Sequence, residues 1–358
     1  MVWRCLFILI ISLAFGCKKP VTAPDPARNY RMGFMNSAPR YNDFDLFLRS
    51  LNLWTSRADA ATITLEVPWD SLYAGKSPAS YINNNFTGLV NFYRSKNLEI
   101  WISIDPQNGL DRSSDAVELK KMGKSIADAE VQQRYQLFVL AMDSMLKPTH
   151  IGLAMETNLI RLAAPSSIYQ GVKTAANGAA QALKLRKSTA KLSVSVQAET
   201  AWGRLQRTNQ YIGVEQDFSD FPFIEELGIS SYPYFGYNNP EEIPNNYYTQ
   251  LLNNRTLPVY VAEGGWATTS FTAPNAFNVN GSEEVQERYF RKHHTILNQA
   301  KALAWFQLVF TDIDVIALPS QVDPSIVNFA TLGLVTTNFT PKSSFKVWDS
   351  LYALQRKP

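Results

Sequence analysis

Eight short runs rich in apolar and β-branched residues recur along the chain and alternate with amphipathic stretches. The runs cover residues 32–36, 62–68, 99–105, 150–156, 191–199, 224–232, 258–264 and 302–309. Between them, apolar residues recur at three- and four-residue spacing in segments 42–54, 81–95, 128–145, 166–183, 244–252 and 283–302. Strands that alternate with helices indicate a parallel sheet, and eight strands favour a closed one. We therefore predict a single (β/α)8 barrel of the α/β class.

The length of 358 residues would also allow two domains, but barrels of this class often run to about 250–400 residues as one domain. No repeat or change of composition divides the sequence. An open, doubly wound sheet is the alternative architecture, although no G-x-G-x-x-G motif follows the first run. In a closed barrel the loops after the strands build the active site, so we expect functional residues at the carboxyl ends of the runs.

The first residues have the features of an export signal. Arg4 is followed by an apolar run at 5–15, which is too short to span a bilayer and typical of a signal peptide. The sequence Leu13-Ala14-Phe15-Gly16-Cys17 then resembles a bacterial lipoprotein signal, with Ala14 in place of the usual Leu. We predict a signal peptide at 1–16, a lipidated Cys17 with a tether at 17–29, and a barrel domain at 30–358. A plain secretory signal is the alternative.

The composition excludes several functions. Thirty-four Lys and Arg balance 31 Asp and Glu to a net charge of +3, without a basic run, so nucleic acid is not an expected partner. Three His and two Cys are too few for the usual protein-held zinc or iron–sulfur site, and we expect no metal and no cofactor. Chemistry carried out by Asp and Glu carboxylates is the class of function that the composition still allows.

Two strand ends carry a glutamate in an otherwise apolar run. Glu156 closes the fourth run in Ile151-Gly-Leu-Ala-Met-Glu, and Glu263 closes the seventh in Val259-Tyr-Val-Ala-Glu-Gly-Gly-Trp. An ionised carboxylate is costly to bury, so a glutamate at such a position indicates either a basic partner or a functional role. Two carboxyl groups that face one cavity suit glycoside hydrolysis, in which one protonates the leaving oxygen and the other attacks the anomeric carbon. The glycines after Glu263 would leave Trp266 at the rim as a sugar platform.

On these motifs the sequence resembles the clan A retaining glycoside hydrolases, and within them the endo-β-1,4-galactanase family, from about residue 30 to 354. The resemblance implies a (β/α)8 barrel with Glu156 as acid/base and Glu263 as nucleophile. It also implies that Tyr232, in Ser230-Ser-Tyr-Pro-Tyr, hydrogen-bonds the nucleophile, and that Trp305 floors the sugar site. Aromatic residues, 12% of the chain, cluster at predicted strand ends where sugars could stack, namely Trp69, Trp202, Tyr232, Tyr234, Trp266 and Trp305.

The sequence departs from this family at its acid/base motif. The residue before the acid/base is usually an Asn that binds the sugar 2-hydroxyl, and here it is Met155, whose thioether cannot replace it. Asn158 is a partial substitute. The family's Arg on strand two and His on strand three are also missing. Polar residues that end strands three and five could rebuild the site, namely Asp105, Gln107, Gln197 and Glu199 with Trp202, although each could equally be a satisfied loop residue.

These observations predict a lipid-anchored, monomeric cell-envelope protein, periplasmic or surface-exposed. We expect a retaining β-glycosidase that acts on a polysaccharide or oligosaccharide through Glu156 and Glu263. One alternative is a catalytically lapsed barrel that captures glycan at the surface, which Met155 and the missing basic residues favour. Another alternative is an assembly component, which only the predicted tether supports.

Overall fold

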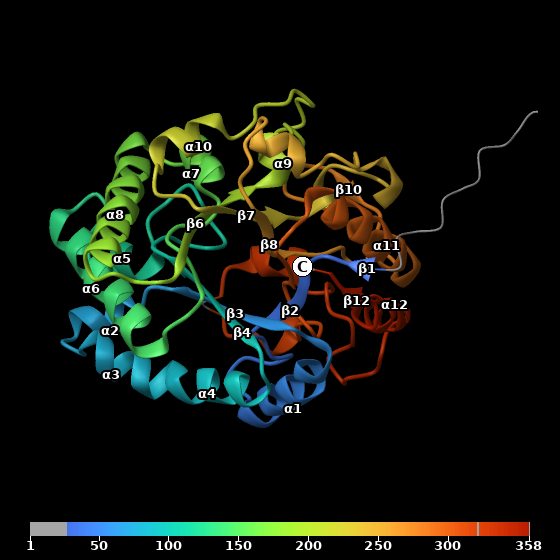
Figure 1. Ribbon diagram of the computed structural model, residues 1–358, viewed down its shortest axis with the longest axis horizontal. Helices are drawn as coiled ribbons and strands as arrows, with labels where there is room; N and C mark the ends of the chain where they lie inside the picture. Colours follow the sequence, from blue (N-terminus) through green and yellow to red (C-terminus); the bar gives the residue numbers. More distant parts are fainter. Residues whose placement is uncertain (1–26, 321, 358) are drawn as a thin grey trace, which may run out of the picture.

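The computed structural model describes residues 27–320 and 322–357, and its centre is a closed parallel barrel (Figure 1). Eight strands close it in the order β11-β2-β3-β4-β5-β6-β7-β8. Each lies within a run predicted from the sequence or overlaps it, so the predicted (β/α)8 architecture is confirmed. The strands are β2 (Arg31–Met35), β3 (Ala60–Glu66), β4 (Glu99–Asp105), β5 (His150–Gly152), β6 (Lys191–Gln197), β7 (Glu226–Ser231), β8 (Val259–Gly264) and β11 (Ala304–Gln307).

Side chains fill the inside of the barrel. Trp101 of β4, Tyr260 of β8 and Phe306 of β11 contact one another in a small apolar cluster that also includes alanines of β3, β8 and β11. Beside them, His150 stacks on Trp101 and bonds Glu99 and Glu226 at the amino ends of the strands. The amino end of the barrel is thus packed and ion-paired, which leaves the carboxyl end for a cavity.

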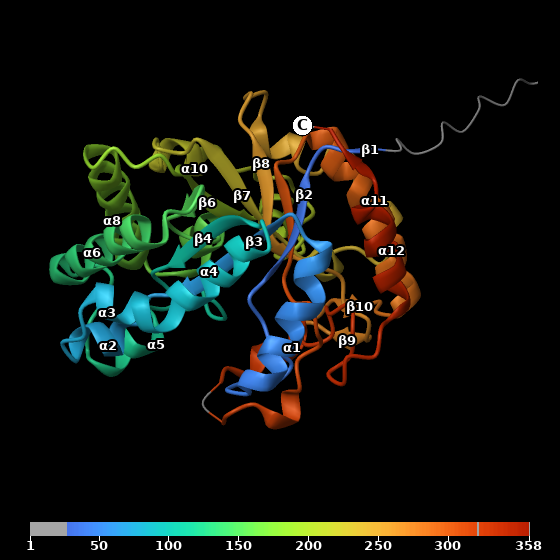
Figure 2. The same cartoon turned by 60° about the horizontal axis from the view of Figure 1, so that its bottom comes forward.

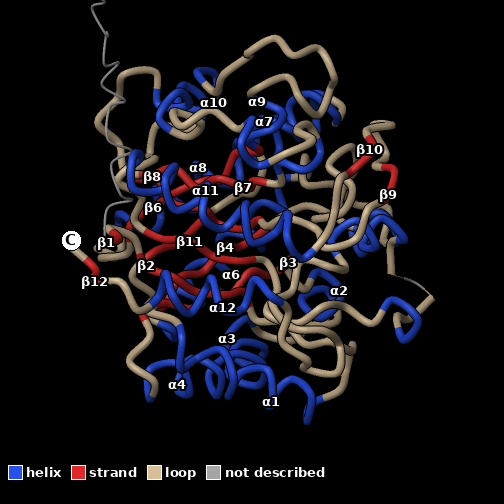
Figure 3. Tube along the Cα trace, turned by 90° about the vertical axis from the view of Figure 1, so that its right-hand side faces the viewer, coloured by secondary structure: helices blue, strands red, loops and turns tan. Residues whose placement is uncertain are grey.

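Helices surround the barrel on its outside (Figure 3). In α8, for example, Val172, Ala176, Ala179 and Leu183 recur at helical spacing and are all buried, as expected for one amphipathic face. The helices are α1 (Phe44–Trp54), α2 (Trp69–Tyr73), α3 (Pro78–Ile82), α4 (Gly88–Ser95), α5 (Val117–Lys121), α6 (Ala129–Leu146), α7 (Thr157–Ala163), α8 (Ser166–Leu185), α9 (Ala198–Ala201), α10 (Glu215–Asp220), α11 (Glu283–Ala300) and α12 (Ser343–Tyr352).

Some predicted helices differ from those observed. Segment 81–95 is divided into α3, a π-helical turn at Asn83–Thr87 and α4. Segment 244–252 forms only a 3-10 turn at Thr249–Leu252, because the consecutive asparagines after Pro244 are weak helix formers. Helix α12, which the sequence analysis did not predict, covers the outside of the barrel beside α11.

The described residues begin at Ala27, within the predicted tether at 17–29. Ala27 and Arg28 form β1, which pairs with β12 (Gln355–Arg356), and the Arg28 guanidinium bonds Asp59 at 2.6 Å. The predicted signal peptide and Cys17 lie outside the described residues. Within the described ranges, no helix is both long and apolar enough to cross a membrane.

Long connections gather at the carboxyl ends of the strands, away from the end where β1 and β12 lie (Figure 2). The connection between β8 and α11 contains a small hairpin, β9 (Phe271–Thr272) with β10 (Asn278–Val279). The connection after β11 contains 3-10 turns at Val315–Ala317 and Pro324–Phe329. These segments form the walls around the strand ends.

Candidate active site

A bulge in β8 directs Glu263 into the barrel mouth. Ile229 of β7 pairs with Val261, but the next residue, Ser230, pairs with Glu263, so Ala262 is the extra residue. Tyr260 and Ala262 both belong to the interior cluster, and strict alternation would turn Glu263 toward the helix layer. A bulge changes this direction, as it often does next to active sites.

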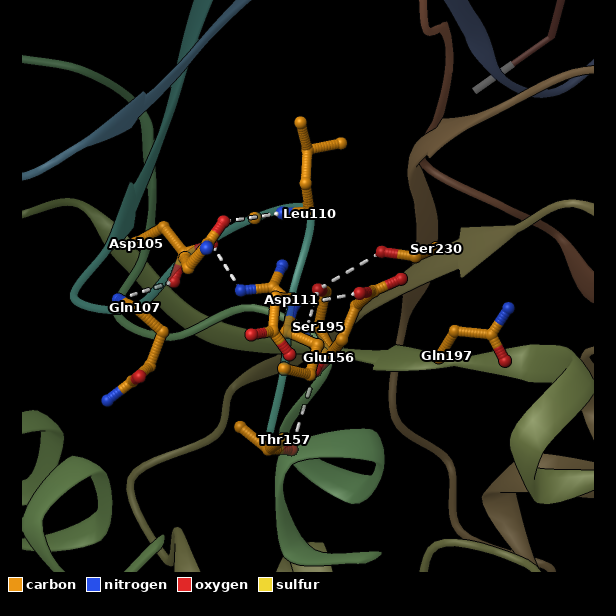
Figure 4. A network of polar contacts seen from close by, with 12 residues as sticks. Asp105, Gln107, Leu110, Asp111, Glu156, Thr157, Ser195, Gln197 and Ser230 are labelled. Atoms are coloured by element: carbon orange, nitrogen blue, oxygen red, sulfur yellow. Dashed lines mark hydrogen bonds and ion pairs between the residues drawn. The ribbon is translucent and has the colours of Figure 1, made fainter. Parts of the chain in front are cut away.

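Glu156 reaches the same mouth through an unusual backbone conformation. It stands at the start of α7 with φ 50° and ψ 44°, a left-handed conformation that costs a non-glycine residue about 1–2 kcal/mol. Its backbone N–H donates to the Ser195 hydroxyl at 3.0 Å, and Ser195 lies 3.4 Å from the Ser230 hydroxyl (Figure 4). This conformation, held by a hydrogen bond to β6, makes Glu156 a candidate for a functional role.

Arg112, which the sequence analysis did not single out, lies between two of the acidic residues. Its Nε donates to Glu156 at 2.9 Å and its terminal nitrogen to Asp105 at 2.6 Å. All three side chains are buried. Arg112 comes from the loop after β4, where no motif marks it, and it supplies a cation in a barrel that lacks the family's Arg on strand two and His on strand three.

Both glutamates line one cavity of about 850 Å3, hereafter the larger lobe. Its polar wall follows the ends of β3 and β4, where Glu66, Asp105 and Arg112 lie, and Glu66 accepts the Gly109 N–H at 2.7 Å. The β2 and β11 connections supply the apolar residues Phe47, Leu308, Ile313, Leu318 and Ile326, and the β2 connection also supplies polar ones, among them Asn36, Arg40 and Asp43. Met155 lines it as well.

A second cavity of about 280 Å3, hereafter the smaller lobe, adjoins the first. The two lobes share Gly109, Leu110, Arg112, Glu156, Tyr232 and Phe329. Glu263 lines only the larger lobe, whereas Glu156 lines both. The acid/base candidate therefore stands where the two lobes meet.

The two glutamates are both buried, and Glu156 influences the protonation of Glu263. Burial raises the pKa of Glu263 to about 7, nearby Glu156 adds to the rise, and Arg112 and the Tyr232 and Ser230 hydroxyls oppose it. Burial also raises the pKa of Glu156, but there the Arg112 guanidinium is in direct contact and opposes the rise. The pair consequently retains a proton near neutral pH, and Arg112 favours the ionised form of Glu156.

Several aromatic residues proposed as sugar platforms lie elsewhere. Trp305 packs between the barrel and α11 and α12, against Phe290 and Trp348, and Trp266 is buried on Tyr289. Both predictions are corrected: each side chain turns toward the helix layer, where the barrel's outer core needs it. Within residues 27–320 and 322–357, no tryptophan lines either lobe. The predicted sugar-platform role of Trp69 and Trp202 is therefore corrected as well, because Trp69 is fully buried and Trp202 stacks on Tyr247.

Some of the other predicted site residues line a lobe, and the rest make hydrogen bonds within the protein. Tyr232 lines both lobes, Asp105 the larger and Gln197 the smaller. Three others line neither lobe. The Asn158 amide pairs with the backbone of Gln197, the Tyr234 hydroxyl donates to the Asn328 carbonyl, and Glu199 is buried among Tyr247, Ser231 and Gln197.

Glu199 has a pKa raised to about 7 by burial, yet its oxygens accept hydrogen bonds from the protein itself. Gln107 is completely buried and its amide has no partner. In the part of the chain that the structure describes, no group of three or more His, Cys, Asp or Glu side chains is arranged to hold a metal ion.

The fold is that of several solved glycoside hydrolases. An exo-β-1,4-mannosidase from Opitutaceae bacterium strain TAV5 aligns over 91% of this chain with a TM-score of 0.66 and 16% identity. A β-glucosidase from Thermotoga maritima aligns over 93% (TM-score 0.62, 8% identity), and a β-glucuronidase from an uncultured Clostridium sp. over 90% (TM-score 0.57, 12% identity).

The chain spans 59% of the mannosidase, 99% of the glucosidase and 50% of the glucuronidase. No protein-family model and no curated protein matches the sequence. At these identities the similarity establishes the (β/α)8 fold of the chain.

Proposed function

We propose that this protein is a retaining β-glycosidase. The observation that carries the proposal is that Glu156, at the start of α7, and Glu263, in β8, line one cavity, where burial raises the pKa of both and Glu156 adds to the rise for Glu263. Structural similarity to a β-mannosidase, a β-glucosidase and a β-glucuronidase supports it. So does the resemblance to clan A, from which we take the two glutamate roles but not a galactan substrate.

In the proposed first step, a Glu263 oxygen attacks the anomeric carbon and forms a glycosyl-enzyme ester. Glu156 transfers its proton to the departing oxygen as the glycosidic bond breaks. In the second step Glu156 takes a proton from water, the water oxygen attacks the anomeric carbon, and the Glu263 carboxylate is released. The configuration of the anomeric carbon is retained because it inverts twice.

The remaining groups of the site prepare these steps. The proton that the pair holds must be on Glu156 when the bond breaks, so the Glu156–Arg112 contact loosens at that point. Arg112 keeps its 2.6 Å contact with Asp105, which leaves the guanidinium in the site. Tyr232 and Ser230 hydroxyls stabilise the ionised form of Glu263, as a nucleophile requires.

The test is the stereochemistry of hydrolysis on a panel of β-glycosides. Proton NMR of the first product should show the β-anomer before mutarotation, and a covalent intermediate should be detected by mass spectrometry on Glu263. Glu263→Gln and Glu156→Gln should each abolish turnover, while Glu284→Gln, an exposed glutamate, should not. An α-anomer as first product would refute the retaining mechanism.

A lapsed, glycan-binding barrel gives a different result in the same panel. It would bind a glycan without hydrolysing it, and Glu263→Gln would change nothing. Met155 is the observation that favours this alternative, because it lines the larger lobe where the family has an amide. The left-handed Glu156 and the buried Arg112 favour the enzyme, since a binder has no use for a strained carboxylate.

We also propose that the protein is anchored to the cell envelope through Cys17. The apolar run at 5–15 and the cysteine that follows it support this proposal. Metabolic labelling with palmitate should mark the wild-type protein and not Cys17→Ser. Labelling that persists in the variant, or is absent from both, would contradict it.

A further inference from the structure

The smaller lobe is lined by Glu156, the proposed acid/base, and not by Glu263, the proposed nucleophile. During glycoside cleavage the transferred sugar must contact both carboxyl groups, which only the larger lobe provides. The leaving oxygen lies at the acid/base group, on the side of the anomeric carbon opposite the nucleophile. Because Glu156 lines the smaller lobe and Glu263 does not, the leaving group extends into the smaller lobe.

The lining of the smaller lobe is largely apolar. Leu110 comes from the loop after β4, Leu159 and Ala163 from α7, Leu205 from the connection after α9, and Phe235 from the segment after β7. Pro274 and Phe329 complete this lining from the β9–β10 hairpin and the last 3-10 turn. Phe329 contacts the Tyr232 ring at 4.9 Å, so apolar surface continues up to the reacting groups.

Most polar side chains of this lobe are already engaged by the protein. The Gln197 amide donates to Glu199 at 2.6 Å and accepts from the Thr200 N–H. The Asn275 amide donates to two backbone carbonyls and accepts a backbone N–H. Asp111 accepts from two serine hydroxyls, and Arg112 holds Asp105 and Glu156. These groups are not free to bind the hydroxyls of a second sugar. Among the remaining polar side chains of the lobe are Ser325, whose hydroxyl has no partner among the described residues, and Asn328.

A sugar in this lobe would therefore replace only a few of the hydrogen bonds to water that it loses, which is costly for each buried hydroxyl left unpaired. An apolar ring or chain would gain by leaving water at about 25 cal/mol per Å2. We propose that the smaller lobe is a leaving-group site for an apolar, non-sugar group, so that the substrate is a β-glycoside of an aryl or alkyl alcohol rather than a polysaccharide. This inference rests on the proposed glycosidase activity.

The experiment compares leaving groups on the same sugar. Benzyl and hexyl β-glycosides of glucose, galactose, mannose and glucuronic acid are assayed beside the β-linked disaccharides of those sugars. Benzyl and hexyl alcohols are no better leaving groups than a sugar hydroxyl, so a preference for them reports binding. We expect kcat/KM at least about tenfold higher for the benzyl or hexyl glycoside of the accepted sugar. The benzyl-to-hexyl ratio then distinguishes an aryl from an alkyl occupant.

Two variants on the same helix test whether the smaller lobe causes the preference for an apolar leaving group. Leu159→Gln places an amide in the lobe, whereas Leu162→Gln changes an exposed leucine of α7 that does not line it. Leu159→Gln should lower kcat/KM for the benzyl glycoside about tenfold and leave the disaccharide rate unchanged or raised; Leu162→Gln should change neither. Leu205→Gln, from a different element, should repeat the effect if Leu159→Gln unfolds.

The outcomes are distinguishable. Hydrolysis in which the disaccharide is preferred, or equal loss on both substrates in Leu159→Gln and Leu205→Gln, overturns the apolar leaving-group site and leaves the glycosidase intact. A folded protein that hydrolyses no glycoside of the panel refutes the proposed function itself, and the inference with it.

Discussion

Replacing Arg112 with Gln should shift the pH profile of catalysis upward. Its guanidinium contacts Glu156 at 2.9 Å and affects Glu263 through space, and in both cases it opposes the effect of burial on the pKa. Two opposite charges about 4 Å apart attract by about 4 kcal/mol at an effective dielectric of 20, which corresponds to roughly 3 pKa units. Relaxation and water entry reduce this to about 1–3 units in measured cases.

The direction of the expected pH shift follows from the protonation state of the two glutamates that Arg112 favours. It stabilises the ionised carboxylates, so without it both groups keep their protons to higher pH. In kcat/KM the basic limb reports loss of the proton from the acid/base Glu156, and the acidic limb reports ionisation of the nucleophile Glu263. We expect the basic limb of Arg112→Gln to move up by about 1–3 pH units and the acidic limb to move up by less, because only Glu156 touches the guanidinium.

The assay measures kcat/KM from pH 4 to 10 for the wild type, Arg112→Gln and Arg112→Lys. Arg112→Lys keeps the charge and should keep both limbs near their wild-type positions. Arg40→Gln is the matched control, because Arg40 lines the rim of the larger lobe but pairs with Asp314 in an exposed position. A basic limb of Arg112→Gln that stays in place or moves to lower pH would refute this account of the site.

Three further predictions concern the nucleophile, the barrel floor and a corrected aromatic. Glu263→Gln should lower turnover by about 10³-fold or more with little loss of ligand affinity, measured by kinetics and calorimetry. Burial opposes the charge of His150, but hydrogen bonds to Glu226 and Glu99 outweigh it and raise its pKa. That stability is fully present below about pH 6.5 and is lost as pH rises through the raised pKa, so denaturant unfolding should show His150→Gln destabilised most at acidic pH and least at alkaline pH. Trp305→Ala should cost about 3–5 kcal/mol of unfolding free energy and leave KM unchanged, whereas a KM effect without destabilisation would restore it to the sugar site.

The eight strands could be predicted because each is a short apolar run between amphipathic segments, a pattern that depends only on local sequence. Which face of a strand a given residue occupies could not be predicted in the same way. In β11, Ala304-Trp305-Phe306-Gln307, all four residues are buried, so no polar side identifies the outside. Phe306 faces inward and Trp305 outward, and the sugar-platform interpretation of Trp305 assumed the opposite.

The carboxylates were identifiable for a related reason. A glutamate that ends an apolar run stands out against its neighbours, and the sequence analysis chose Glu156 and Glu263 on that contrast. Arg112 has no such contrast, because a basic residue in a polar loop is ordinarily solvated. Its burial is decided by the loop after β4, which places the guanidinium between Asp105 at the end of β4 and Glu156, 44 residues further along the chain.

The position of Arg112 also bears on what Met155 means. The family's missing basic residues and the Met155 substitution together suggested a lapsed site, since each removes a group that binds or neutralises charge near the reacting sugar. Arg112 supplies a buried cation from a different loop, in contact with the acid/base group itself. A site that had lost its function would have no reason to keep a strained Glu156, a bulge that turns Glu263 inward and a guanidinium that bridges two carboxylates. The strained backbone and the buried charges cost stability, and such a cost persists where the site has a function, so they favour a rebuilt catalytic site with a different sugar-binding pattern over a decayed one.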